Sequence, residues 1–377
     1  MARPTGAQCV APTDESKQFA PVLVGQSAAE MATVDMATTA MQQAVSQSSA
    51  GPVTVHVLSL SSGGQYGAFG AGFLRGWSEN PVTPRPDFDL VTGVSTGGLL
   101  APVAFAGAAF DPILDTYRGI AQADVYRNYP PLTIPFRPSV ASTAPLQRLI
   151  NNQLSDELID TIAARHTNEG AQLLVSAANL DTTENRIFNL TDVASSPTSA
   201  AMRRNCLTEV LLASAAVPGL FAPRQIGGEL YADGGLRDHV FFRAVESARA
   251  QVARDTGRDL RVEASVIVNG ALRRPGSPAP DTLTGYFARS AEILADEVLR
   301  DSIAETVAFA QGRPHWRIKG VFAEVDLTAA GCAASQASGT IDPCVTTALF
   351  DAGRTLAATA PINWKSAQDL RQKAGEL

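Results

Sequence analysis

The 377-residue sequence has no long apolar run, no cationic cluster and few histidines. No segment reaches the roughly 18–20 apolar residues that a membrane-spanning helix needs. The formal net charge is −7 and the lysines and arginines are scattered, so the electrostatic signature of a nucleic-acid-binding protein is missing. With only 4 histidines, the chain offers few candidates for a histidine general base. The 45% hydrophobic content is enough for a substantial core in one or two domains.

A glycine-rich turn follows the first strongly apolar segment of the chain. Residues 53–60 form a near-continuous apolar run that is typical of a buried parallel strand, and the next residues read SSGGQYGAFGAG. Small residues in succession allow backbone N–H groups to face inward and hold negative charge. We therefore predict that Gly63, Gly64, Gln65 and Gly67 form an oxyanion loop.

A dinucleotide-binding turn is the alternative interpretation of this loop. The segment from Ser62 to Gly67 differs by one residue from the G-x-G-x-x-G fingerprint. That fingerprint requires an acidic residue at the end of the next strand, about 20 residues further on. Asp87 and Asp89 have about this separation, but they stand at the start of the expected strand. The sequence therefore favours the oxyanion loop.

A second glycine-flanked turn, GVSTG, carries a candidate nucleophile. It lies between an expected strand at 88–91 and an expected apolar helix at 98–106. A serine at a tight strand-to-helix turn has a strained backbone and an exposed hydroxyl. Gly93 and Gly97 remove the collision between the two arms of such a nucleophile elbow. Because the following helix directs unpaired N–H groups toward the turn, we predict that Ser95 is a nucleophile.

A serine nucleophile needs a partner that takes its proton. None of the histidines lies in a sequence context that marks a catalytic triad. A carboxylate can act instead, since burial raises its proton affinity. Asp233 is the best-placed carboxylate, at a predicted strand end and before two glycines, although D-G-G alone is by default a β-turn. A Ser-His-Asp site that uses His239 or His315 is the alternative.

The four cysteines bear on the compartment in which the protein works. Cys332 and Cys344 bracket a polar, glycine-containing segment without metal-site spacing, and we expect a disulfide between them. Cys9 and Cys206 are then the remaining pair. An even number of cysteines in loop-like contexts favours an oxidising compartment, whereas four reduced cysteines in the cytoplasm are the alternative.

The rest of the sequence alternates apolar strands with helices, which predicts an α/β fold with parallel strands. Residues 117–145 differ, because five prolines forbid a long helix there, while Tyr126, Tyr129 and Phe136 add apolar surface. This segment is either a flap that lines an apolar substrate groove or a crossing loop with buried aromatics. A long amphipathic helix is expected at 284–310.

Four blocks together resemble one protein family. They read SLSSGGQYGAFGAGFL, FDLVTGVSTGGLLAP, ASAAVPGLFAP and LYADGGLRDHV, and they span roughly residues 53–240. In kind and order they are similar to the motifs of the patatin-like phospholipases, serine acyl hydrolases with a Ser-Asp dyad. The resemblance implies a three-layer α/β/α sandwich with a mainly parallel central sheet. It also implies a lipid acyl hydrolase in which Ser95 is the nucleophile, Asp233 the base, and neither a metal nor an organic cofactor takes part.

The sequence departs from the family pattern at three positions. Ser62 stands at the first glycine of the loop, Tyr66 at the usual lysine or arginine, and His239 at the common asparagine. Without the cation, the expectation of a phosphate-bearing substrate is weaker than that of an acyl ester. In its details the chain looks most like the bacterial cell-envelope branch of the family.

These observations give the expected organisation of the chain. A lead-in and peripheral helix occupy 1–50, the catalytic domain 51–325, and a cysteine loop with helices packed on the core 326–377. The expected partner is a lipid or other acyl ester, with peripheral membrane contact and no nucleic acid. We expect a cell-envelope, periplasmic or secreted location, with the cytoplasm as second choice and no signal peptide in the printed sequence, because residues 1–25 lack an apolar run. A non-catalytic envelope protein that keeps the fold is a further alternative.

Overall fold

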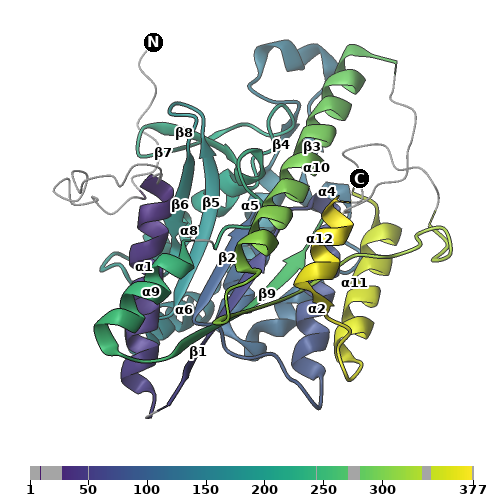
Figure 1. The fold of residues 1–377 in the computed structure, drawn as a ribbon. Coiled ribbons are helices and arrows are strands. Elements are labelled where there is room, and N and C mark those ends of the chain that lie inside the picture. Colours follow the sequence, from purple (N-terminus) through teal and green to yellow (C-terminus); the bar gives the residue numbers. More distant parts are fainter. Residues whose placement is uncertain are drawn as a thin grey trace.

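A mainly parallel sheet runs through the centre of the protein and carries helices on both faces (Figure 1). The computed structural model describes Cys9 and residues 28–49, 51–242, 244–270, 281–332 and 341–375. Five parallel strands lie side by side in the order β10, β9, β1, β2, β5. Their bounds are β1 Val53–Leu60, β2 Leu90–Val94, β5 Gln172–Asn179, β9 Leu260–Val268 and β10 Trp316–Phe322.

Antiparallel strands complete both edges of the sheet. β6 (Asn185–Asn189) and β8 (Glu229–Asp233) both pair with β5, and β7 (Arg224–Ile226) pairs with β8. At the other edge, β11 (Lys365–Ser366) pairs with β10. The pairing of β8 with β5 matters for the site, because it places Asp233 opposite Ala177.

Two apolar clusters fill the spaces between the sheet and its helical layers. β1 contributes to both, since Leu58 and Leu60 point to one face and Val55 and Val57 to the other. The first face is covered by α2 Gly67–Glu79, α3 Thr96–Ala106, α5 Ala144–Gln153, α6 Asp156–Glu169, α7 Leu190–Ser195, α8 Ala200–Ser214 and α11 Pro343–Ala358. The second face is covered by α1 Ala28–Gln47, α9 Val245–Thr256, α10 Leu283–Ala310 and α12 Ala367–Gly375. The predicted three-layer α/β/α sandwich is confirmed.

The strand before the nucleophile is longer and later than the sequence indicated. It was expected at 88–91, whereas β2 extends from Leu90 to Val94. The shift arises because β2 pairs with β5 as far as Val94, which lies opposite Ser176. The Thr92-Gly93 pair, which is locally typical of a turn, is therefore part of the strand. Pairing with neighbouring strands thus overrides the local propensity.

Residues 117–145 form a small hairpin rather than a plain crossing loop. They contain α4 (Gln122–Val125) and the paired strands β3 (Arg127–Asn128) and β4 (Ala141–Ser142), with a 3-10 turn at Pro131–Phe136 between the strands. The aromatic side chains have different environments. Tyr126 is buried against Phe221, whereas Phe136 is exposed.

Close glycine contacts join α2 to α11. A Cβ atom at Gly72 would lie 2.0 Å from the Phe350 carbonyl oxygen, and one at Gly353 would lie 2.2 Å from the Phe69 carbonyl oxygen. A Cβ at Gly76 would similarly meet the carbonyl of Arg354 at 2.2 Å. The helices can approach this closely only without these side chains. The C-terminal segment is thereby packed against the helix that follows the glycine-rich loop.

Gly353→Ala should reveal how tight this crossing is. In an open helix the change would stabilise the protein by up to about 1 kcal/mol, because alanine has the higher helix propensity. Here the added methyl group overpacks the α2 backbone, and we expect a loss of about 1–3 kcal/mol in the free energy of unfolding by urea. The exposed Thr355→Ala on the same helix is the control, with a change below about 0.5 kcal/mol. A stabilised Gly353→Ala variant would contradict the tight crossing.

Candidate active site

The candidate site lies at the carboxyl ends of the parallel strands, where ligands bind in open α/β sheets. The glycine-rich loop follows β1, and Ser95 follows β2 directly. Asp233 is the last residue of β8, which approaches the same end of the sheet in the antiparallel direction. The sheet therefore brings together three segments that are far apart in the sequence.

Ser95 occupies a strained turn between β2 and α3. Its φ of 52° and ψ of −121° are unusual for a residue with a side chain. The glycines on either side permit the turn. A Cβ atom at Gly97 would lie 2.2 Å from the Leu60 carbonyl oxygen, and one at Gly93 would lie 2.7 Å from the carbonyl oxygen of Gly97. The backbone thus has the geometry of a nucleophile elbow.

Two further serines hold this turn in place, and sequence analysis did not assign them this role. The backbone N–H of Ser95 donates to Ser214 Oγ at 2.9 Å, and Ser214 Oγ donates to the Ser176 carbonyl at 2.7 Å. Ser214 ends α8 within the ASAAVPG block, so its position in that block was the only available signal. The chain of bonds connects the elbow to α8 and β5.

Asp233 faces Ser95 directly. Ser95 Oγ donates to Asp233 Oδ2 at 2.5 Å, and the N–H of Gly235 donates to Asp233 Oδ1 at 2.8 Å. The carboxyl group is buried, and its backbone N–H is held by the Ala216 carbonyl at 2.9 Å. Burial raises the pKa of Asp233 from 3.8 to about 6, although both hydrogen bonds to the carboxylate act in the opposite direction. Such a pKa suits a general base near neutral pH.

The glycine-rich loop closes over the elbow. Gly64 has a φ of +56°, and Thr96 Oγ1 donates to its carbonyl at 3.1 Å. The first N–H groups of a helix have no partner within it, and in the structure described here the N–H groups of Gly63, Gly64 and Gln65 donate to no other residue. These three N–H groups are free to face an oxyanion.

Gly67 contributes to the loop in a different way from the expected one. Its N–H donates to the Gly64 and Gln65 carbonyls and is therefore not a free oxyanion donor. Its missing side chain is what matters, because a Cβ atom there would lie 2.0 Å from Thr96 Cγ2. Gly67 allows the loop to contact the residue that follows Ser95.

His239 is bonded to the loop and not to Ser95. Its Nδ1 forms a short hydrogen bond with Ser62 Oγ, and its backbone N–H donates to Ser302 Oγ at 3.1 Å. Both Ser62 and His239 are buried, and burial lowers the pKa of His239 to about 4. Ser62 and His239, which both depart from the family pattern, thus connect the glycine-rich loop to the turn after Asp233.

His315 lies at the other end of the sheet, just before β10. Its Nδ1 is 3.4 Å from Asp259 Oδ1, and its carbonyl accepts from the N–H of Val262 near the start of β9. Neither histidine is brought into hydrogen-bond contact with Ser95 in the described structure. The geometry gives no support to the Ser-His-Asp alternative.

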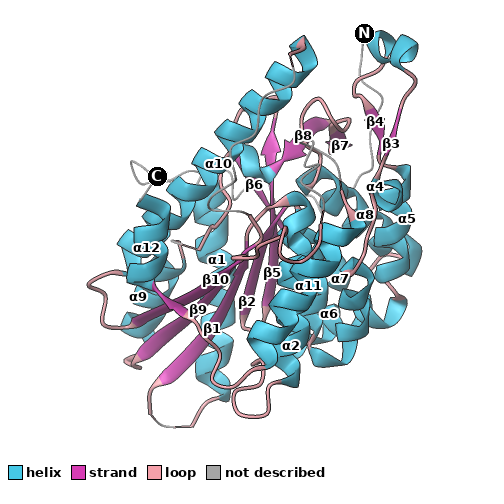
Figure 2. Cartoon of the chain, turned by 90° about the vertical axis from the view of Figure 1, so that its right-hand side faces the viewer, coloured by secondary structure: helices cyan, strands magenta, loops and turns pink. Residues whose placement is uncertain are grey.

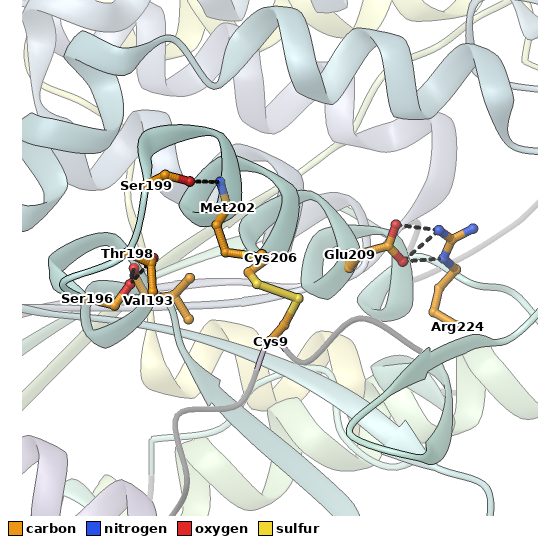
Figure 3. The surroundings of a disulfide bond; sticks show 9 residues. All are labelled: Cys9, Val193, Ser196, Thr198, Ser199, Met202, Cys206, Glu209 and Arg224. Carbon is orange, nitrogen blue, oxygen red and sulfur yellow. Dashed lines mark hydrogen bonds and ion pairs between the residues drawn. A yellow bond between two sulfur atoms is a disulfide. The ribbon is translucent and has the colours of Figure 1, made fainter. Parts of the chain in front are cut away.

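Disulfides join Cys9 to Cys206 and Cys332 to Cys344. Figure 3 shows the first, which ties Cys9 to α8 between the helix cap formed by Ser199 and the Glu209–Arg224 ion pair. The second anchors the start of α11, where the N–H of Asp342 donates to Gln65 Oε1 of the glycine-rich loop at 3.2 Å. Each disulfide therefore lies on a helix that contacts the site, through Ser214 at the end of α8 and through Asp342 at the start of α11.

Metal-ligating side chains do not gather anywhere in the described ranges. Within them, no group of three or more His, Cys, Asp or Glu residues is arranged to hold a metal ion. The polar groups at the site itself are a serine, one carboxylate and backbone N–H groups.

The three-layer fold and the strained turn at Ser95 place this chain in the class of α/β proteins that carry a serine at the carboxyl end of the parallel strands. Residues 58–245 match the family model of the patatin-like phospholipases, and the chain belongs to this family. The matched segment contains the glycine-rich loop, Ser95 and Asp233. The closer resemblance to the cell-envelope branch stays a prediction.

Asp233→Asn should stabilise the protein, and more so at high pH. The pKa of Asp233 is about 6 in the folded protein and 3.8 in the unfolded chain, so ionised Asp233 opposes folding. The contribution of Asp233 to the free energy of unfolding therefore falls as the pH rises from 3.8 to about 6. The gain of the variant over the wild type in the urea-derived free energy of unfolding should grow by about 1–1.5 kcal/mol between pH 5 and pH 8.

Glu184→Gln, at an exposed position, is the control and should change stability by less than about 0.5 kcal/mol at either pH. An Asp233→Asn variant that loses stability at pH 8 would show that Asp233 is held as a favourable ion.

Proposed function

We propose that this protein is a carboxylic-ester hydrolase that acts on lipid acyl esters through a Ser95–Asp233 dyad. Membership of the patatin-like phospholipases supports lipid acyl hydrolase activity in general. The observation that carries the dyad is the 2.5 Å hydrogen bond from Ser95 Oγ to Asp233 Oδ2 at a strained elbow. No metal or organic cofactor is needed for this chemistry.

The reaction begins with acylation of Ser95. Ser95 Oγ attacks the ester carbonyl carbon while its proton passes to Asp233 Oδ2. Negative charge develops on the carbonyl oxygen, and the N–H groups of Gly63, Gly64 and Gln65 are proposed to hold it, each donor contributing about 3–4 kcal/mol. The intermediate collapses as the alcohol leaves with the proton from Asp233, and an acyl ester on Ser95 is formed.

Hydrolysis of the acyl-enzyme repeats these steps with water. Asp233 takes a proton from the water as its oxygen attacks the acyl carbon, and the same N–H groups hold the second oxyanion. Collapse returns the proton to Ser95 Oγ and releases the fatty acid. The raised pKa of Asp233 lets one carboxylate both accept and return the proton near neutral pH.

The loop offers N–H donors and no cation. Tyr66 occupies the position at which the family commonly has a lysine or arginine. We therefore propose that the ester group and the acyl chain, rather than a phosphate, provide the main recognition at Ser95.

Ser95→Ala and Asp233→Asn should each lower kcat for p-nitrophenyl butyrate by at least about 1000-fold, because nucleophile and base act as one unit. The double variant should be no worse than either single one. Thr208→Val removes a buried hydrogen bond to Asn151, away from the elbow, and should keep full turnover. Substantial turnover by either dyad variant would refute the mechanism.

Two further measurements separate this dyad from its rivals. Because the ionised base is the active form, wild-type kcat/KM should rise with pH through about 6, and His239→Gln and His315→Gln should keep this limb. Loss of the limb in either variant would point to a histidine base. A fluorophosphonate probe that fails to label Ser95 would indicate a non-catalytic protein that retains the fold.

We further propose that the protein works in an oxidising compartment, with the bacterial cell envelope as first choice. The two disulfides in the described structure support this location, since such bonds persist mainly outside the reducing cytoplasm. None of the helices in the described ranges has the length and apolar character needed to cross a membrane. Alkylation of the protein from its native source, followed by mass measurement, should find no free thiol. Four alkylated cysteines would place the protein in the cytoplasm.

A further inference from the structure

The proline-rich hairpin, residues 126–142, carries two large apolar side chains in full contact with solvent. Leu132 and Phe136 are each 89% exposed, and both lie on the 3-10 turn at the hairpin tip. They are the most exposed large hydrophobic residues in the described structure. Prolines on both sides of them restrict the backbone, so the tip cannot easily fold back to bury these side chains.

Exposed arginines flank this apolar tip in the sequence, and the nearest acidic residue is Asp124, just before the hairpin. Residues 125–155 contain Arg127, Arg137 and Arg148 and no aspartate or glutamate, in a chain whose net charge is −7. All three arginines are exposed, and the Arg137 guanidinium lies 4.0 Å from the centre of the Tyr129 ring. Exposed apolar side chains next to exposed cations match the chemistry of an anionic lipid surface, which has charged headgroups above acyl chains.

The base of the hairpin is connected to the candidate active site. The N–H groups of Val140 and Ala141 donate to the carbonyls of Gly219 and Leu220, each at 3.0 Å. The Tyr126 ring packs edge-on against Phe221, 5.4 Å between ring centres. The same segment begins with Ala216, whose carbonyl accepts from the N–H of Asp233 at 2.9 Å.

The hairpin also projects at the end of the sheet where the site lies. In both views, β3 and β4 extend beyond the central strands at the end where β8 lies (Figures 1 and 2). The upper part of α10 projects at this end as well, and its Tyr286, Ile293 and Leu294 are exposed. The hairpin tip therefore lies at the same end of the sheet as the site (Figures 1 and 2).

We propose that the proline-rich hairpin anchors the protein on an anionic lipid surface, with Leu132 and Phe136 inserted and Arg127 and Arg137 on the headgroups. The anchor rests on the proposed function and deepens it, because it makes the substrate an ester within an anionic bilayer. It leaves the bond-breaking chemistry at Ser95 unchanged. Its effect is to bring lipid esters to Ser95 from a surface that the hairpin holds close.

Binding to vesicles tests the anchor directly. Wild-type protein should co-sediment with vesicles of phosphatidylcholine and phosphatidylglycerol at a 7:3 ratio, and much less with phosphatidylcholine alone. Leu132→Ser/Phe136→Ser should lower the partition coefficient at least about 10-fold. Arg127→Gln/Arg137→Gln should bind the anionic vesicles as weakly as it binds the neutral ones, and its binding should respond less to salt. Val82→Ser is the matched control, since Val82 is 68% exposed but lies before β2 at the opposite end of the sheet.

Turnover of two substrates separates the anchor from the catalytic proposal. The tip variant should keep wild-type kcat/KM for soluble p-nitrophenyl butyrate and lose most of its activity on esters in anionic vesicles. Vesicle binding is also measured with Ser95→Ala, because binding needs no catalysis. A wild type that hydrolyses no ester would refute the proposed function, and the vesicle-binding result would still decide the anchor. Equal vesicle binding by wild type and tip variant, or no binding by the wild type, would overturn the anchor. A wild-type dimer that the tip substitutions dissociate would instead assign this surface to a second copy of the chain.

Discussion

The buried hydrogen bond between Ser95 and Asp233 sets the conditions that the rest of the structure has to meet. The two residues come from separate strands, and a carboxylate that is 7% exposed opposes folding once it ionises. The parallel pairing of β2 with β5 and the antiparallel pairing of β8 with β5 bring both groups to one point. Ser214 then fixes the elbow, and the N–H of Gly235 is the second donor to the carboxylate. The two large apolar clusters on either side of the sheet stabilise the fold and offset the free energy that burial of the carboxylate costs.

The contact between Ser62 and His239 shows how an unusual loop sequence can be accommodated. The loop carries a serine at a position where glycine is usual in the family, and its hydroxyl needs a partner once it is buried. His239 supplies that partner from the turn after Asp233. As a result, the loop with the free N–H groups and the turn with the carboxylate are joined by side chains. The distance between the two parts of the site is thereby restricted.

Local sequence was sufficient for features that depend on neighbouring residues. β1 has the bounds that its apolar run indicated, and Gly93 and Gly97 stand where the elbow needs them. Features that depend on distant pairing were not visible. The role of Ser214, the contact of His239 with Ser62 and the later position of β2 all follow from how elements pack in three dimensions. A hydrogen-bond partner more than a hundred residues away leaves no mark on the local pattern.

The glycine crossing of α2 and α11 has a consequence for the order in which the chain matures. α2 starts at the loop that faces Ser95, and Asn80, just after it, donates to the carbonyl of Ala357, 277 residues further along. Contacts this distant in sequence form late, because a long loop must close before they give any stability. During synthesis, the helix behind the loop thus lacks its support until almost the whole described chain has emerged. A nascent chain that already contains Ser95 and Asp233 therefore still lacks the helix that packs behind the glycine-rich loop.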